Sequence, residues 1–311
     1  MNAEKDRYPY GNANGPKGPE TTGERSATVL LVDGMATLFR AYYATAGSGD
    51  VVRTRTGVPV NGIHGFLRLL GAAVSAFRPT HVACCWDREE ATFRAAQYPG
   101  YKAHRPETPP DLVPQFGLIR EVLDRFGIPN VSAAGYEADD CLGTLARRFR
   151  KEAAVYVLTG DRDLLQLVDE RVRVVLFQNG FVRFKVYTPA LVLEETGIRP
   201  DQLTDLKGLM GDRSDNYPGV AGIGAKTAVR LLREYGSVDG ILANLDQLSP
   251  SLRRKIEADL DMLHLSRRLA TLDCAAPIGL KLADCRWQAD RARVTDVCEA
   301  LGFRDRLRWI G

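Results

Sequence analysis

The chain has 311 residues, 45% of them hydrophobic and 26% charged, and a formal net charge of +3. This composition is ordinary for a soluble globular protein, and no apolar stretch approaches the roughly 18 residues of a membrane-spanning helix. The length allows one large core and a smaller satellite domain. The six cysteines form no C-x-x-C pair, which favours reduced thiols in a cytoplasmic protein. Residues 1–26 are polar, rich in Gly and Pro and without an apolar signal core, so we expect a disordered tail.

Apolar and amphipathic segments alternate through the first part of the chain. Their patterns predict strands over 28–33, 80–87, 128–133 and 154–160, and helices over 35–44, 63–77, 111–127, from 136 onwards, and over 161–168. A hairpin over 172–187 is expected to turn at Asn179-Gly180. This order is typical of an α/β protein with a mostly parallel central sheet flanked by helices. We therefore expect one α/β core over 27–187.

The pattern becomes helical after Thr188, with helices expected within 190–197, 201–211, 225–236 and 250–272. We therefore predict a second, helical region over 188–311. Its string PGVAGIGAKTAVRLL places two glycine turns before a helix, as in a helix–hairpin–helix element, which we assign to 201–236. Such turns expose backbone N–H groups to phosphates; the candidate contacts are Gly222, Gly224, Lys226 and Thr227. The alternative is a plain glycine-rich connection between helices.

Residues 88–110 interrupt the α/β pattern with a polar, basic segment that carries interleaved aromatic residues. We expect a mobile excursion over the sheet edge. Lys102 and Arg105 could stabilise charge that develops on a phosphate, and Tyr101 could stack on a base. The alternative is a solvated basic loop.

Nine acidic residues follow predicted strands or open predicted helices, where catalytic groups gather in open α/β sheets. They are Asp33, Asp87, Glu137, Asp139, Asp140, Asp161, Asp163, Asp212 and Asp215. A lone aspartate at such a place is often only a helix cap, but here five segments would bring acids to one edge. Their repulsion would require divalent cations, and two Mg²⁺ ions can activate a water and compensate charge on a leaving oxygen. Against the 30 other acids stand 42 basic residues, a surplus that suits a polyanionic partner.

These motifs, in this order, resemble the bacterial 5′ nuclease family, which includes stand-alone 5′–3′ exonucleases, phage flap endonucleases and the N-terminal nuclease domain of DNA polymerase I. The matching strings are LVDG, FRAYYA, YKAHRPETP, YEADD, LTGDRDLLQLV and DLKGLMGDRSDNYPGVAGIGAKTA, and the resemblance spans roughly 27–300. It implies a PIN-like nuclease core crossed by an arch over 88–110. Because the chain ends at Gly311 without a polymerase domain, we expect a stand-alone member.

The resemblance also implies roles for individual residues. The first metal site would comprise Asp33, Asp87, Glu137, Asp139 and Asp140, and the second Asp161, Asp163, Asp212 and Asp215. Tyr101, Lys102 and Arg105 would be the catalytic residues of the arch, and Arg40 a DNA contact. A K⁺ ion would bind main-chain carbonyls of Leu209, Met210, Pro218, Val220 and Ile223.

The expected function is a Mg²⁺-dependent 5′–3′ exonuclease and flap endonuclease of DNA replication or repair, with Mn²⁺ as a substitute metal. The substrates would be DNA with 5′ flaps, nicks or free 5′ ends, and the protein a monomer that binds no membrane. One alternative is a nuclease of the same chemistry that removes RNA primers from DNA. The other is a structure-specific DNA-binding protein without catalysis.

Overall fold

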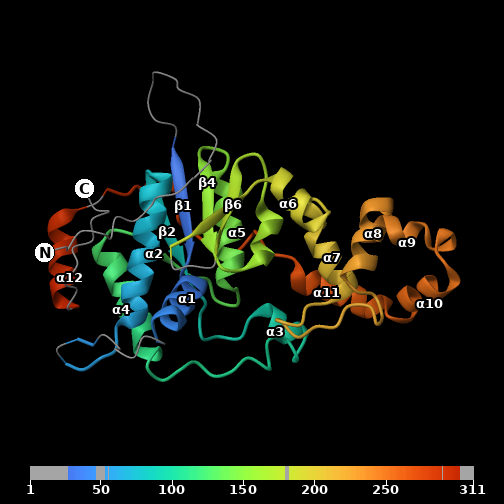
Figure 1. The fold of residues 1–311 in the computed structure, drawn as a ribbon, viewed down its shortest axis with the longest axis horizontal. Helices are drawn as coiled ribbons and strands as arrows, with labels where there is room; N and C mark the ends of the chain where they lie inside the picture. Colours follow the sequence, from blue (N-terminus) through green and yellow to red (C-terminus); the bar gives the residue numbers. More distant parts are fainter. Residues whose placement is uncertain (1–26, 47–52, 55, 179–181, 289, 302–311) are drawn as a thin grey trace, which may run out of the picture.

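The computed structural model describes residues 27–301, apart from 47–52, 55, 179–181 and 289 (Figure 1). The expected N-terminal tail and the Asn179-Gly180 turn lie outside these ranges. Within them, no helix combines the length and the apolar character that crossing a membrane demands. Cys84, Cys85, Cys141, Cys274 and Cys285 are free thiols.

A six-stranded sheet forms the centre of the molecule, in the order β3-β2-β1-β4-β5-β6. The strands are β1 (Thr28–Asp33), β2 (His81–Cys85), β3 (Asn130–Val131), β4 (Ala154–Thr159), β5 (Val172–Phe177) and β6 (Phe184–Tyr187). All neighbours pair in parallel except β5 and β6, which form the expected antiparallel hairpin. The mostly parallel α/β fold predicted from the sequence is confirmed.

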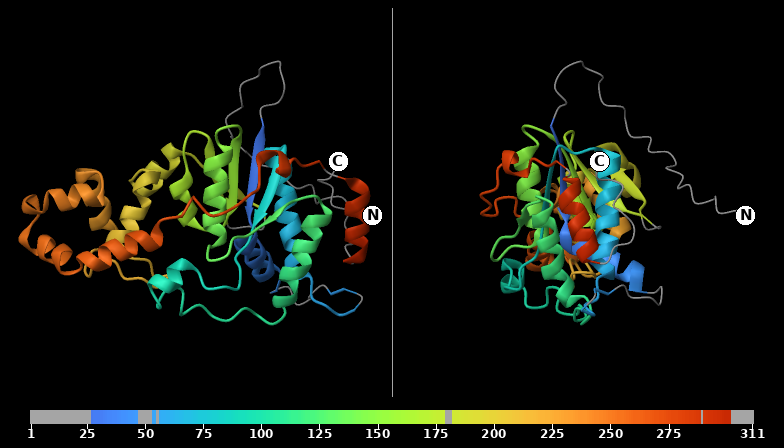
Figure 2. Two further views of the ribbon diagram at one scale, coloured as in Figure 1. Left: turned by 180° about the vertical axis from the view of Figure 1, so that it is seen from behind. Right: turned by 90° about the vertical axis from the view of Figure 1, so that its left-hand side faces the viewer.

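Helices cover both faces of this sheet (Figure 2). Side chains alternate along β1, so that Leu30 and Val32 enter one core while Val29 and Leu31 enter the other. The first core is closed by α1 (Gly34–Ala46), α2 (Asn61–Phe77) and α4 (Val113–Arg125), and the second by α5 (Ala138–Phe149) and η1 (Arg162–Leu167). The helix expected over 161–168 is thus a 3₁₀ helix.

The basic segment 88–110 is not a free loop in this structure. It contains a short helix, α3 (Phe93–Gln97), whose Arg94 is only 1% exposed, followed by turns that bury Tyr101. Arg94 contacts both the sheet domain and the end of a distant helix through hydrogen bonds to Asp140 and Leu269. In this structure the polar groups of these side chains are therefore satisfied by other segments of the chain, and the expected mobility of the segment stays a prediction.

A helical lobe extends away from the sheet (Figure 1). It comprises α6 (Pro189–Thr196), η2 (Pro200–Gln202), α7 (Leu203–Met210), α8 (Ala225–Tyr235), α9 (Val238–Ala243), η3 (Leu245–Gln247), α10 (Pro250–Ala258) and α11 (Leu260–Ala270). Residues of α7, α8, α9, α10 and α11 share a separate apolar core. Between α7 and α8, Gly211 and Gly219 lie back to back with φ of 72° and 67°. A Cβ on Gly219 would lie 2.2 Å from the Gly211 nitrogen, so only glycine fits there.

The chain beyond α11 departs from the expected division into a core and a helical region at 188. It returns to the sheet domain through η4 (Leu282–Cys285) and α12 (Arg291–Ala300). Arg286 bridges to His81 at the start of β2, and the Trp287 indole donates a hydrogen bond of 3.1 Å to the Phe126 carbonyl. Val297 enters the same core as α4. Burial of Cys285, Trp287 and Val297 thus ties this last segment to the sheet.

Candidate active site

The first group of acids forms where parallel strands end. Asp33 is the last residue of β1, Asp87 follows β2 by two residues and Asp161 follows β4 by two, so all three reach the same edge of the sheet. Asp33 accepts hydrogen bonds from the Ala36 amide (2.9 Å) and the Thr159 hydroxyl (2.7 Å). Asp87 accepts one from the Ala138 amide at the start of α5 (2.7 Å). The strand ends and the N-terminus of α5 are thereby fixed around one point.

Burial and repulsion from neighbouring acids disfavour the charged forms of Asp33, Asp87 and Asp139, and the pKa of each is raised. Burial raises the pKa of Asp33 to about 7, and the charges of Asp87 and Asp161 add to the shift, against the hydrogen bonds that lower it. The pKa of Asp139 is raised well above its ordinary value by burial and by the charges of Asp161 and Asp33. Among the described residues, none donates a hydrogen bond to the Asp139 carboxylate. Asp33, Asp87, Asp139 and Asp161 thus form one electrostatically coupled group with oxygen lone pairs to spare.

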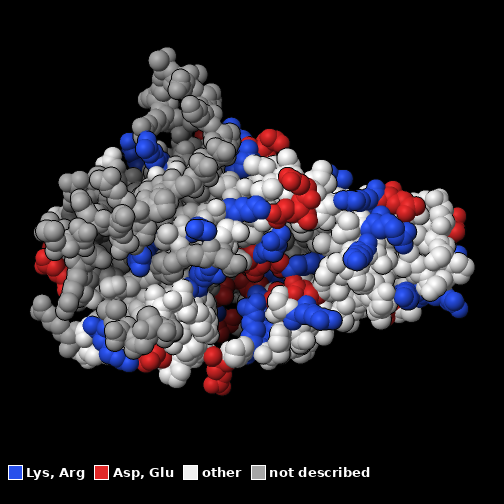
Figure 3. Space-filling view, in the orientation of Figure 1, with Lys and Arg blue, Asp and Glu red and all other residues white. Residues whose placement is uncertain are grey.

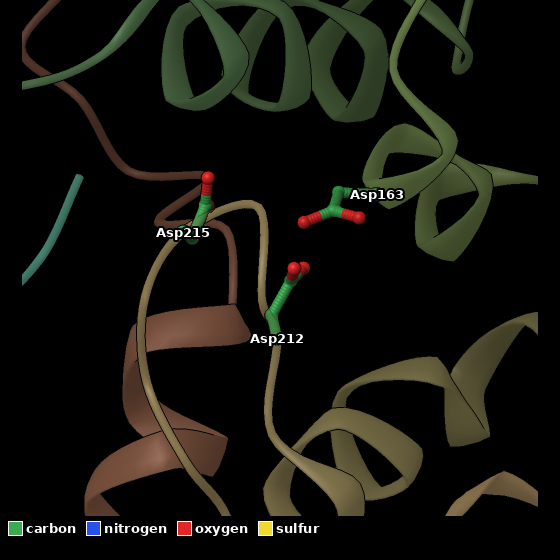
Figure 4. Close-up of side chains that lie close together, drawn as sticks. All are labelled: Asp163, Asp212 and Asp215. Atoms are coloured by element: carbon green, nitrogen blue, oxygen red, sulfur yellow. The ribbon is translucent and has the colours of Figure 1, made fainter. Parts of the chain in front are cut away.

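A second group combines the sheet domain with the helical lobe. Asp163, Asp212 and Asp215 each offer an oxygen, and these atoms all lie within 4.8 Å of one another. Figure 4 shows the carboxylates of Asp163 and Asp212 facing each other, with Asp215 beside them on the same loop as Asp212. Backbone hydrogen bonds between Asp212 and Tyr217 (2.8 and 3.0 Å) close that loop. Burial, followed by the charge of Asp161, raises the pKa of Asp163 to about 7.

Asp161 connects the two groups instead of belonging to the second alone. Its charge raises the pKa of Asp139 in the first group and that of Asp163 in the second. The two groups therefore make one continuous acidic surface. Figure 3 shows acidic side chains in a hollow at the centre of this face, with basic side chains around it. All side-chain donor atoms in both groups are oxygens, which are the ligands that Mg²⁺ prefers.

Asp140 is predicted as a metal ligand, but its carboxylate accepts four hydrogen bonds from within the protein. It is fully buried, and its carboxylate accepts two hydrogen bonds from the Arg94 guanidinium, both of 2.7 Å. The same carboxylate accepts the amides of Asp273 (2.8 Å) and Glu137 (3.1 Å). All four lone-pair positions of the carboxylate are used, so none faces the acidic surface. Glu137 is the N-cap of α5 and Asp140 is its third residue, the spacing of a capping box. A capping role for Asp140 fits these hydrogen bonds better than a role as a metal ligand.

Basic side chains already neutralise several of the acids. Lys102 Nζ lies 2.7 Å from Glu137, and the Arg105 guanidinium lies 2.8 Å from Asp215. Lys207, in α7, contacts both Asp163 and Asp212. Burial lowers the pKa of Lys207, but the two carboxylates outweigh it and raise this pKa to about 12. The predicted arch cations thus lie directly against the acids.

Tyr101 contacts Glu137 and Asp215 through its hydroxyl and is largely buried. Its hydroxyl lies 3.0 Å from Glu137 and 3.2 Å from Asp215, and its ring stacks on Tyr217 with centroids 6.5 Å apart. Only 7% of the residue is exposed. In this structure the ring packs against protein, and stacking of Tyr101 on a base stays a prediction.

Two hydrogen bonds hold residues 100–102 of the arch against the Asp212–Tyr217 loop. The Lys102 amide donates to the Asp215 carbonyl (2.9 Å), and the Asn216 side chain donates to the Gly100 carbonyl (2.7 Å). Lys102 and Asn216 both have left-handed backbones, with φ of 54° and 62°. Positive φ values carry a cost in conformational free energy for non-glycine residues. The two hydrogen bonds between the segments offset this cost.

The predicted DNA contacts lie in the helical lobe, except for Arg40. Gly224 is the N-cap of α8, with no side chain capping that helix, and Gly222 has φ of 75°. Lys226 is exposed and Thr227 half-buried in the first turn of α8. Arg40, in α1, donates a hydrogen bond to the Gln178 carbonyl beyond β5. The glycine turn and the first turn of α8 thus lie in the helical lobe, whereas Arg40 lies in the sheet domain, in the helix that follows Asp33.

The carbonyls predicted to hold K⁺ lie around the same glycine turns. Val220 donates to the Leu209 carbonyl (2.9 Å), and Ile223 donates to the Val220 carbonyl (3.1 Å). The backbone of Met210 lies next to Gly219, and that of Pro218 next to Gly211. Each carbonyl retains a second lone pair, so a K⁺ ion at this turn stays a prediction.

Three residues at the site were missed by sequence reasoning. Arg94 pairs with Asp140, far along the chain. Lys207 pairs with the distant Asp163 and with Asp212 in the next turn. Asn216 contacts Gly100 of the arch, more than a hundred positions away. A signal existed for Lys207, because this lysine lies in the last turn of α7, five residues before Asp212. The sequence held no comparable signal for Arg94.

Comparison with known proteins identifies the family. A model of the 5′-3′ exonuclease N-terminal resolvase-like domain matches residues 28–197, and one of the 5′-3′ exonuclease C-terminal SAM fold matches residues 198–293. The chain belongs to the 5′-3′ exonuclease family. The resemblance inferred from the motifs is confirmed.

Individual relatives agree with this assignment. The chain is 49% identical over 269 residues to a 5′-3′ exonuclease of Bacillus subtilis, covering 86% of this chain and 91% of that protein. It is 40% identical over 282 residues to DNA polymerase I of Bacillus caldotenax, of which it covers 32%.

Solved structures share the fold at low identity. One is a T5 5′-exonuclease with bound divalent metal ions (zinc), with a TM-score of 0.65 and 22% identity over 88% of this chain and 99% of that chain. Another is flap endonuclease-1 from Methanococcus jannaschii, with a TM-score of 0.55 and 20% identity over 92% and 90% of the two chains.

Proposed function

We propose that this exonuclease-family protein hydrolyses DNA phosphodiesters near 5′ ends, both from free ends and at 5′ flaps, with Mg²⁺ or Mn²⁺ as cofactor. The observation that carries the proposal is the continuous surface of Asp33, Asp87, Asp139 and Asp161 with the second acidic group. Aspartates that only cap helices would not be expected to lie so close to one another, because their charges repel. Burial and repulsion make the surface unfavourable until cations neutralise it.

Divalent cations bound by these acids would polarise the phosphodiester and activate the attacking water. Asp33, Asp87 and Asp139 are the proposed ligands of the first site, and Asp163, Asp212 and Asp215 of the second. Asp161 lies between them and can serve either. The zinc-bound relative of the same fold supports divalent metals here. Asp140 is left out of the proposed ligand set because Arg94 saturates it.

Lys102 and Arg105 are the proposed stabilisers of charge on the reacting phosphate. Both already present their cations at the acidic surface, paired with Glu137 and Asp215. Arg105 is half-exposed, so it can exchange its carboxylate for a phosphate oxygen with little rearrangement. Lys102 is held in place from both ends, by its backbone bond to Asp215 and its ammonium bond to Glu137. A preorganised donor of this kind stabilises a transition state more than a bound substrate.

The helical lobe is the proposed contact to duplex DNA. The uncapped N-terminus of α8 presents free amide N–H groups, which bind phosphate without reading sequence. Lys226, Arg230 and Arg233 line one depression along α8. Figure 3 shows Lys and Arg gathered over this helix. Relatives of the same fold have been crystallised with DNA substrate, which agrees with this assignment.

The test compares wild type with Asp139→Asn on 5′-flap, nicked and RNA-primed DNA in Mg²⁺. Wild type should release products from the 5′ side of flap and nicked DNA. Asp139→Asn should bind the same substrates in Ca²⁺ but cleave none of them. Preference for the RNA-primed substrate would move the proposal to primer removal, and tight binding without cleavage by wild type would leave a DNA-binding protein only.

A further inference from the structure

Lys207 lies at the centre of the second acidic group. Its ammonium contacts one oxygen of Asp163 and one of Asp212, and the three carboxylates of the group lie within 4.8 Å of one another. The side chain is 19% exposed, and the two carboxylates that it contacts are 17% and 10% exposed. The positive charge is therefore largely shielded from water and is held by two of the three carboxylates that are proposed to hold a metal ion.

An ammonium group and a divalent cation cannot share these oxygens. Mg²⁺ binds oxygen at about 2.0–2.1 Å and Ca²⁺ at about 2.3–2.6 Å, so an ion coordinated by Asp163 and Asp212 would be adjacent to the nitrogen. The two positive charges repel each other strongly at that distance, because little water is present to screen them. One of the two cations must leave the group.

We propose that Lys207 is the resident counter-ion of the second acidic group, and that a divalent cation enters this group only by displacing its ammonium. This inference rests on the proposed metal-dependent function. The lysine stem is long and flexible, so the ammonium can swing out while α7 stays packed. Lys207 therefore stabilises the metal-free protein and lowers the affinity of the second group for metal.

The pairing also connects two parts of the molecule. Asp163 lies in η1 of the sheet domain, whereas Lys207 and Asp212 belong to the helical lobe. Without metal, Lys207 links the lobe to the sheet domain across the acidic surface. With metal, the ion itself takes over that link. The lobe thus remains attached in both states, while the lysine is bound to acids in only one of them.

Calorimetric titration with Ca²⁺, without DNA, tests this inference. Lys207→Met should bind Ca²⁺ at least tenfold more tightly than wild type at one site, a gain of about 1.4 kcal/mol. Adding Asp212→Asn to that variant should abolish the tightened binding. Lys185→Met is the matched control, because it removes a lysine–carboxylate pair outside both groups and should leave the affinity unchanged.

Thermal unfolding supplies an independent readout. In EDTA, Lys207→Met should unfold at a lower temperature than wild type, and Ca²⁺ should raise its melting temperature by more than that of wild type. Lys207→Arg keeps the charge and should bind Ca²⁺ no more tightly than wild type, which keeps the test decisive if Lys207→Met does not fold. Unchanged or weaker Ca²⁺ binding by folded Lys207→Met, or tighter binding by Lys207→Arg, overturns the inference. Absence of Ca²⁺ binding in wild type and every variant would instead contradict the proposed metal sites.

Discussion

Two adjacent aspartates at the start of α5 should respond in opposite ways to the same substitution. Asp140 accepts four hydrogen bonds in a fully buried place, two of them from Arg94. Asp139 accepts none from the described residues and faces other acids. We predict that Asp140→Asn mainly destabilises the fold, whereas Asp139→Asn abolishes cleavage and leaves the free energy of unfolding unchanged or increased.

The magnitude follows from the partners that Asp140→Asn would leave behind. The substitution replaces one carboxylate oxygen by an NH₂ group. That oxygen accepts two hydrogen bonds, one from Arg94 and one from a backbone amide, and an NH₂ group can accept neither. Among the residues that the structure describes, Glu137, at 3.0 Å, then remains as the one ionic partner of Arg94. Breaking a buried ion pair costs about 3–5 kcal/mol, and the remaining Glu137 places this case near the lower value of about 3 kcal/mol. For a chain of 311 residues, with an unfolding entropy of about 2.1 cal/mol/K per residue, that loss lowers the melting temperature by roughly 5 °C.

Urea and thermal unfolding in EDTA measure this difference without any metal or substrate. A double-mutant cycle with Arg94→Met isolates the pair: Asp140→Asn should cost much less once the buried cation is gone. If Asp140→Asn unfolds like wild type and yet loses Ca²⁺ binding, Asp140 is a metal ligand and its proposed structural role is wrong.

Three further substitutions test other parts of the site. Lys102→Ala should slow single-turnover cleavage about 10²-fold with little change in DNA affinity measured in Ca²⁺, and a loss confined to affinity would make Lys102 a phosphate anchor only. Asn216→Ala should be about 1 kcal/mol less stable to urea than Asn216→Gly, because only alanine suffers strain at φ of 62°; equal stabilities would remove the strain argument. Gly219→Ala should lose more than 3 kcal/mol or fail to fold, because its Cβ would lie 2.2 Å from a backbone nitrogen, and a stable Gly219→Ala protein would contradict the close approach of the two glycine turns.

The sheet could be predicted because its strands carry local signals. β1 and β4 are short apolar runs, and each is followed by an aspartate where the strand ends. Parallel order then brings Asp33, Asp87 and Asp161 to one edge without any knowledge of packing. The position of these acids in the fold was therefore accessible from the chain alone.

The sequence did not reveal which acids face the acidic surface and which are bound by other side chains. Asp139 and Asp140 are neighbours of the same type, and their roles differ because a helix turns successive side chains by about 100°. Which of the two meets Arg94 depends on where α3 packs, and that short helix carries little periodic signal. The return of Trp287 to the sheet domain is a comparable long-range contact, which a helical pattern after residue 188 does not reveal.

The dependence of the single-turnover rate on Mg²⁺ concentration tests the central claim most directly. The substrate is a 5′-flap DNA labelled at its 5′ end, and the enzyme is in excess. If the acidic surface works through two divalent cations, cleavage should be absent in EDTA and should rise with about the second power of Mg²⁺ concentration below saturation. Cleavage that persists in EDTA, or that reaches its full rate with a first-power dependence in wild type, would contradict the two-metal account.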